Sequence, residues 1–297
     1  MKTLLAVLLI FGFAVASPAE ENPLAGVIDI HVHCAPDSAP RKIDAIDLAR
    51  LAKSRGMRGM VLKNHYEPTA SLAYVVRKEV PGLEVFGGVD LNLSVGGMNP
   101  SAVEHMAATT GNYGRFVWMS TFDSEAQVRY SKQNRPFVRV SQNGQLLPET
   151  KQVIAVIAKD NLVLATGHPS AEEALMMVRE GRAQGVKHIV VTHAMMAPIH
   201  MSDAQMLEAA KMGAYIEFVY NGLVGSYKEF TFKDYARAIR YVGVEHCILA
   251  SDMGQPTNPL HPDGLVLLFN GLKEQGITTA EINRMAKENP ARLLGLE

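Results

Sequence analysis

The 297-residue sequence is poor in cysteine and has no excess of charge of either sign. Its two cysteines, Cys34 and Cys247, are too few for the disulfide framework that stabilises small secreted domains. Its 29 lysine and arginine residues nearly balance 30 aspartate and glutamate residues, giving a net charge of −1. We therefore expect no nucleic-acid partner and no attraction to an anionic membrane surface.

Past its N-terminus the sequence has no hydrophobic run near the ~20 residues of a membrane-spanning helix. The N-terminal run Leu4–Ala16 has the length of the apolar region of a secretory signal, with Lys2 before it and small residues at its end. We predict that residues 1–19 are a signal peptide, cleaved near residues 16–19. The protein would then be exported, periplasmic or secreted, with no stable membrane anchor. A membrane anchor or a buried N-terminal helix is the alternative.

Residues 20–297 are expected to form a single domain, and 47% hydrophobic residues are enough for a large core. Short β-branched runs alternate with helical patterns, and eight such units in ~270 residues are typical of a (β/α)8 TIM barrel. The alternative is a doubly wound open sheet, but no G-x-G-x-x-G follows the first strand. The expected strands are Val27–His33, Gly59–His65, Glu84–Asp90, Arg115–Thr121, Leu162–His168, His188–His193, Ala214–Val219 and Cys247–Asp252.

One connection, Ser120 to Pro148 after the fourth strand, is much longer than the ~2–6 residues usual in a barrel. Within it, Asn143-Gly144 between apolar residues predicts a hairpin. The segment is either a surface loop or a lid over the barrel mouth. If it is a lid, its basic residues favour an anionic substrate. Those basic residues are Arg129, Lys132, Arg135 and Arg139, of which Arg135 and Arg139 are our candidate substrate contacts.

Histidines and one aspartate stand at the expected strand ends. His31 and His33 are two residues apart, so they share one face of the first strand. His168 ends the fifth strand, His193 the sixth and Asp252 the eighth. In a barrel the carboxyl ends of all strands open onto the face that holds the active site. We therefore expect these five side chains to converge there.

This set of side chains predicts a divalent metal cofactor. Neutral imidazoles with one carboxylate suit zinc first, and also manganese, iron or cobalt, better than magnesium or calcium. The second strand adds Lys63 and His65 on one face. Lys63 is expected to act in catalysis, as a carbamylated bridge between two metal ions or as a contact for a substrate carboxylate or phosphate. His65 is expected to bind the metal or the substrate.

The other histidines carry weaker expectations, and so do two further residues. Cys34 is expected to pack in the core, and Glu217 faces either the barrel interior or a helix. We expect His188 and His246 at the bottom of the barrel and His105 at the surface. We also expect His200 and His261, on loops after the sixth and eighth strands, at the surface, with the border of the pocket as the alternative.

At these residues the sequence resembles the amidohydrolase superfamily of metal-dependent hydrolases. The matching elements are Ile28-Asp29-Ile30-His31-Val32-His33, His168, His193, Asp252 and the C-terminal segment Asn289–Leu296. The resemblance spans the mature chain and implies a distorted (β/α)8 barrel with one or two divalent metal ions. It implies that His31 and His33 bind the more buried ion, and that His168 and His193 bind a second ion or orient the substrate. Asp252 would be both a ligand and a proton shuttle.

The fourth strand departs from the pattern of the superfamily. Many members with two metal ions carry a bridging lysine or glutamate there, and Arg115–Thr121 contains neither. Either Lys63 takes over the bridging role or the site holds one metal ion.

From these residues we expect hydrolysis of a small molecule by a metal-activated water. The bond would be an ester, lactone, amide or phosphoester, with Asp252 moving protons and His193 stabilising charge. A metal-dependent decarboxylase or isomerase of the same superfamily is the alternative. A third reading is an exported protein that binds metal or solute without catalysis. The sequence leaves the oligomeric state open, and a homo-oligomer is compatible with it.

Overall fold

The computed structural model describes residues 22–296. The predicted signal peptide lies outside these residues. Within the described part of the chain, every helix is too short or too polar to cross a membrane.

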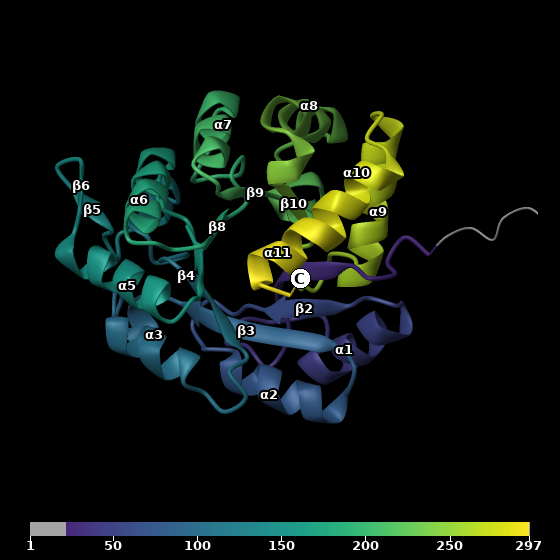
Figure 1. The fold of residues 1–297 in the computed structure, drawn as a ribbon, viewed down its shortest axis with the longest axis horizontal. Helices are drawn as coiled ribbons and strands as arrows, with labels where there is room; N and C mark the ends of the chain where they lie inside the picture. Colours follow the sequence, from purple (N-terminus) through teal and green to yellow (C-terminus); the bar gives the residue numbers. More distant parts are fainter. Residues whose placement is uncertain (1–21, 297) are drawn as a thin grey trace, which may run out of the picture.

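Eight parallel strands form one sheet, in which neighbours follow the order of the chain (Figure 1). The last strand returns beside the first, where Val32 and Met253 form a parallel bridge, so the sheet closes into a barrel. The (β/α)8 prediction is confirmed. The strands are β1 (Ile28–Val32), β2 (Gly59–Leu62), β3 (Glu84–Asp90), β4 (Gly114–Trp118), β7 (Val163–Ala165), β8 (His188–Val191), β9 (Tyr215–Val219) and β10 (Cys247–Ala250).

A helix follows each barrel strand, and polar caps fix where several of these helices begin. The side chains of Ser170, Ser202 and Thr231 each bond a backbone N–H of the first turn, and the residue at the third helical position bonds back to the cap. The surrounding helices are α1 (Ala45–Ser54), α2 (Ala70–Glu79), α3 (Pro100–Ala107), α5 (Pro148–Lys159), α6 (Ala171–Ala183), α7 (Asp203–Lys211), α8 (Phe232–Val242) and α9 (His261–Glu274).

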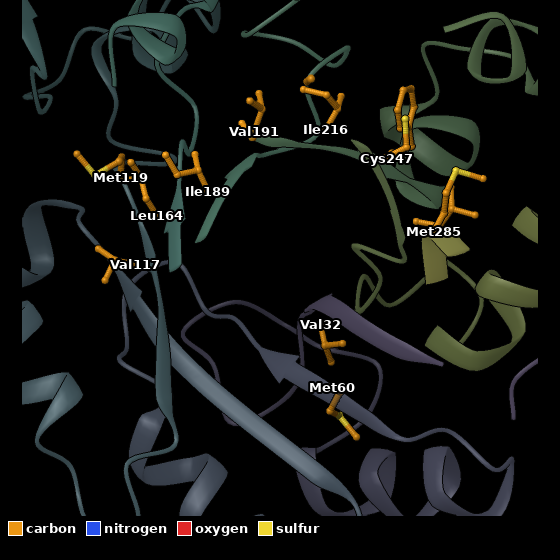
Figure 2. Close-up of a cluster of buried hydrophobic side chains, with 14 of the residues drawn as sticks. Val32, Met60, Val117, Met119, Leu164, Ile189, Val191, Ile216, Cys247 and Met285 are labelled. Atoms are coloured by element: carbon orange, nitrogen blue, oxygen red, sulfur yellow. The ribbon is translucent and has the colours of Figure 1, made fainter. Parts of the chain in front are cut away.

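Two buried clusters hold the barrel together. The outer cluster packs the strands against the helices, and Figure 2 shows members of it on strands around the ring, such as Val117 and Ile189. The inner cluster fills the barrel with residues such as Phe116 and Trp118. After α9 the chain continues through α10 (Thr279–Asn283) to α11 (Asn289–Leu294), which reaches the middle of the ring in Figure 1. There Leu293 joins the inner cluster.

The long connection after β4 is ordered and partly regular. It contains a short helix, α4 (Glu125–Tyr130), and the predicted hairpin, formed by β5 (Ser141–Gln142) and β6 (Gln145–Leu146). Asn143 and Gly144 have positive φ angles of 51° and 72° at its turn, the conformation that this residue pair favours. The hairpin prediction is confirmed.

Candidate metal centre and active site

His31, His33 and Asp252 meet at the carboxyl ends of β1 and β10. One ligand atom from each lies within 4.8 Å of the others, and all three residues are buried. Asp252 Oδ1 is 3.2 Å from Nε2 of His31 and 3.2 Å from Nε2 of His33. The sequence expectation that these three converge is therefore met in space.

The backbone of β1 is irregular where it presents the two histidines. Ile30 points into the barrel, where it lies in the inner cluster, so strict alternation along the strand would point His31 outward. Instead, the register between β1 and β2 shifts between Asp29 and Val32. At this irregularity Asp29 Oδ1 accepts a hydrogen bond from the backbone N–H of His31 at 3.2 Å, and the His31 side chain points into the barrel mouth.

Glu217 on β9 fixes the orientation of His31. Both of its carboxylate oxygens lie 3.2 Å from His31 Nδ1, and it also accepts the backbone N–H of His193 at 2.8 Å. A carboxylate can only accept, so His31 carries its proton on Nδ1. Sequence left the face of Glu217 open. The available signal was a single carboxylate inside an otherwise apolar strand, and the structure places it inward.

The buried carboxylates create a potential that favours positive charge. Burial alone would raise the pKa of Asp252, but the neighbouring His31 and His33 hold it well below its usual range. Burial opposes a proton on His31, yet Asp252 and Glu217 outweigh it and raise the His31 pKa. Burial lowers the pKa of His193 to about 4, so that imidazole is neutral. This negative potential stabilises a positive charge, either a proton on His31 or a bound metal cation.

The donor set fits a divalent metal ion. His31 Nε2 is fully buried and lies 3.2 Å from Asp252 Oδ1 without forming a hydrogen bond among residues 22–296, while Glu217 holds the other ring nitrogen. A histidine held by a carboxylate on one ring nitrogen, with the other free, is the usual arrangement of a metal ligand. Two imidazoles and one carboxylate belong to the chemistry of zinc and the later first-row metals.

His168 and His193 line the same cavity but bond to one another. Their Nε2 atoms are 3.1 Å apart. Gln127 of α4 accepts a bond from His168 Nδ1 at 3.0 Å, which leaves His193 to donate in the pair. His193 Nδ1 is buried without a hydrogen-bond partner in the described chain, so it is the free atom of this pair. His193 also has a positive φ of 23°, a sparsely populated conformation.

Lys63 lies fully buried beneath the histidines. Its Nζ is 3.7 Å from Asp90 Oδ2, beyond hydrogen-bond distance, and 5.5 Å from the centre of the Trp118 ring. Residues 22–296 offer this Nζ no hydrogen-bond partner. Burial raises the pKa of Asp90 to about 6, and Lys63 opposes that rise.

The His65 ring is stacked against two other rings. Its ring stacks on His33 with centroids 4.8 Å apart and on Phe122 with centroids 3.8 Å apart. Its Nδ1 lies 3.0 Å from Thr121 Oγ1, whose own proton goes to Asp90. His65 therefore donates from Nδ1, and only its Nε2 edge is left for another partner.

These side chains line a cavity of about 950 Å³ at the barrel mouth. The long connection after β4 contributes to its wall through residues such as Tyr130 and Arg135. Arg135 is paired with Asp123. Arg139 lies outside the lining, because it pairs with Glu125 at the surface and is 46% exposed. The structure thus brings one of the two candidate arginines to the cavity.

The expectation for His261 is wrong. We expected a surface loop, but His261 begins α9 and is 1% exposed. Its Nε2 lies 2.9 Å from the carbonyl oxygen of His33, so the imidazole supports the metal-ligand segment. The prediction for His200 is confirmed, with a side chain that is 50% exposed. Sequence also gave no sign of Asn221, whose amide donates to Asp252 Oδ2 at 3.1 Å.

The fold and this cluster define a (β/α)8 barrel with a candidate metal centre at the carboxyl ends of its strands. The chain belongs to a family of unknown function, DUF6282, whose model matches residues 26–217. The search of curated proteins found no match.

Solved structures share the fold at low sequence identity. An amidohydrolase from Pseudomonas aeruginosa has a TM-score of 0.60 and 14% identity, covering 92% of this chain and 96% of that one. A triple mutant of organophosphorus hydrolase from Deinococcus radiodurans has a TM-score of 0.62 and 16% identity, covering 93% and 95%. The 2,6-dihydroxybenzoate decarboxylase from Rhizobium has a TM-score of 0.57 and 14% identity, covering 92% and 99%. The resemblance to the amidohydrolase superfamily is confirmed in the fold.

Proposed function

We propose that this protein is a metal-dependent hydrolase of a small anionic molecule, with zinc as the first candidate metal. The observation that carries the proposal is the buried cluster of His31, His33 and Asp252, in which Glu217 holds His31 through Nδ1 and His31 Nε2 faces Asp252 Oδ1 at 3.2 Å. The nearby His33 supplies a second imidazole. The cavity of about 950 Å³ has room for a small substrate, and the named solved structures include hydrolases of this fold.

The side chains of the chain can be given roles in this reaction. A bound divalent cation would act as a Lewis acid and acidify a water molecule. Asp252, kept ionised by its neighbours and oriented by Asn221, would accept the proton of the attacking water and return it to the leaving group. His193 and His168 border the cavity as neutral imidazoles. The N–H that His193 shares with His168 would turn to the substrate oxygen and stabilise its negative charge.

A metal-dependent decarboxylase is the second candidate. Arg41 and Arg135 line the cavity and suit a carboxylate, and Lys63 lies buried at its base with no hydrogen-bond partner in the described chain. The decarboxylase from Rhizobium has the same fold. In this reading the cations would orient the substrate carboxylate, which leaves as carbon dioxide while a proton takes its place on the carbon. No water adds to the product.

Elemental analysis of protein purified without chelators tests the metal centre. We expect one or two divalent ions per chain, and none in the double variant His31→Ala, His33→Ala. Stoichiometric metal in the double variant would show that the cluster is not the site. Loss of one of two ions in Lys63→Ala would support a bridging lysine, whereas one ion in both proteins would assign Lys63 to substrate binding.

Labelled water separates the two reactions. A panel of anionic esters, lactones, amides and phosphoesters is incubated in water enriched in oxygen-18. Hydrolysis places the label in the product. Turnover of a carboxylated substrate with release of carbon dioxide and no label would support the decarboxylase instead.

A further inference from the structure

Arg41, in the loop between β1 and α1, touches a candidate metal ligand. Its Nη2 donates to His33 Nδ1 at 3.2 Å, and its Nε donates to Asp37 Oδ2 at 2.5 Å. The side chains of Arg41 and Asp37 are 7% and 1% exposed. The guanidinium is therefore held in place by a buried carboxylate at one end and points at the imidazole with the other.

This contact decides where His33 carries its proton. A guanidinium has five N–H donors and no acceptor, so the Nδ1 that faces Arg41 must offer a lone pair. A neutral imidazole then has its proton on Nε2, the atom that lies 3.2 Å from Asp252 Oδ1. Because Nδ1 accepts from Arg41, the ring carries only this one proton and is neutral.

His31 and His33 both present Nε2 to the centre of the site, each 3.2 Å from Asp252 Oδ1. They differ at Nδ1, which in His31 donates to Glu217 and in His33 accepts from Arg41. A metal ligand needs a lone pair directed at the ion. In His33 the Nε2 lone pair is taken by the proton, and the Nδ1 lone pair is taken by Arg41. Neither nitrogen of His33 can bind a metal while Arg41 stays in contact with it.

We propose that Arg41 is a positioning residue that holds His33 in a non-ligating tautomer, and that metal binding requires Arg41 to move off His33. The inference rests on the metal centre proposed above. Asp37 anchors the arginine in this position, so the Asp37–Arg41 pair competes with the metal for His33.

Simple charge repulsion must be separated from this tautomer effect. Removing the positive charge of Arg41 would strengthen metal binding on either account. Replacing Asp37 by asparagine distinguishes them, because it removes the charge that anchors Arg41 while making the site more positive. Repulsion alone predicts that Asp37→Asn binds metal more weakly, and the tautomer effect predicts that it binds more tightly.

The test measures the affinity of metal-free protein for Zn²⁺ and Co²⁺ by competition with a chromophoric chelator. We expect Asp37→Asn and Arg41→Gln to bind about tenfold more tightly than wild type, the scale at which residues next to metal ligands act. The matched control is Arg135→Gln, which removes another cavity arginine paired with its own aspartate but not touching His33. Its metal affinity should stay within about twofold of wild type.

Two results would overturn the inference. One is weaker or unchanged binding in Asp37→Asn, and the other is weaker binding in Arg41→Gln, which would make the arginine a support of the ligand. Nitrogen-15 NMR of metal-free wild type provides a check that needs no variant. A proton on Nε2 of His33 is expected, and a proton on Nδ1 would contradict the proposal. Failure of wild type to bind either metal would instead refute the metal centre itself.

Discussion

Glu217 holds His31 through Nδ1, so that Nε2 faces the candidate metal centre, and its replacement gives the sharpest prediction at the scale of one residue. Glu217→Gln keeps the size of the side chain and an acceptor for the His193 backbone, but it loses the charge that holds the His31 proton on Nδ1. We expect metal affinity to fall by about 10- to 100-fold. The chelator competition measures the change.

A second glutamate serves as the control for this prediction. Glu229 also borders the cavity, but it pairs with the half-exposed His200 and touches none of the three cluster residues. Glu229→Gln should leave metal affinity unchanged. A loss as large as that in Glu217→Gln would mean that general charge, rather than the proton on His31, controls binding.

The two cysteines should be chemically silent in the folded protein. Cys34 and Cys247 are free and buried, and burial raises the pKa of both, to about 12 for Cys34. Because the thiolate is the reactive form, neither should react with a disulfide reagent at pH 8. Both should react at once in concentrated urea. Rapid labelling of one thiol in the native protein would show that its segment opens locally.

The sequence predicted the location of individual residues correctly where they stand at the ends of strands. His31, His33 and Asp252 stand at strand ends, and a barrel brings strand ends together. The residues that contact this cluster, such as Asn221 and His261, gave no such signal, because their contacts depend on the direction in which each side chain points. His261 was assigned to the surface since it follows a loop, yet the start of α9 turns inward and buries it.

At the scale of elements, Asn289 attaches the C-terminal helix to the barrel. Its side-chain amide donates to the carbonyl oxygens of Val244 at 2.8 Å and of Cys247 at 2.7 Å, and the residue is fully buried. Asn289→Ala leaves both carbonyls without this donor and should lower the free energy of unfolding by about 1–3 kcal/mol. Urea unfolding monitored by circular dichroism measures the loss. The exposed Asn270 on α9 provides the control, since its replacement by alanine should change stability by less than about 0.5 kcal/mol.

The cap of α10 gives a prediction that depends on pH. Glu281 bonds to Arg240 and to the cap residue Thr278, and these bonds lower its pKa from 4.5 to about 2. The ionised carboxylate therefore stabilises the protein above pH 4.5, and this contribution disappears as the pH falls toward 2. Glu281→Gln can keep the capping bonds but loses the charge. It should cost about 0.5 kcal/mol at pH 7 and progressively less below pH 4.5.

Thermal unfolding across this pH range measures the difference between Glu281→Gln and wild type. The exposed Glu274 at the end of α9 is the matched position, and Glu274→Gln should show no such trend. A difference that stays constant with pH would assign the effect of Glu281 to the cap alone.

The sequence predicted the presence of the barrel strands more accurately than the residues at which they end. All eight barrel strands were expected, but β2 was predicted to His65 and ends at Leu62, and β7 was predicted to His168 and ends at Ala165. The sequence pattern continues through these residues, whereas the ladder stops where the chain turns its polar side chains toward the cavity. The short helix α4 could not be foreseen, since six residues carry too little periodicity.

At the scale of the whole molecule, the candidate metal centre joins β1 to β10 at the seam of the barrel. A ligand that binds only the folded state stabilises it, and free metal at 100 times the dissociation constant contributes about 2.7 kcal/mol. We expect zinc to raise the Tm by several degrees and a chelator to reverse the rise. The double variant of His31 and His33 should show no response. Equal shifts in both proteins would place the stabilising ion elsewhere.

Helix α11 supplies part of the inner cluster, although it follows all eight barrel strands in the order of synthesis. A growing chain makes all eight strands before it makes α11, and until α11 has left the ribosome the floor of the barrel stays open. The inner packing around Phe116 and Trp118 can therefore be completed only after α11 has emerged. A premature stop codon before residue 289 would give a chain that has all eight strands and still cannot close its interior.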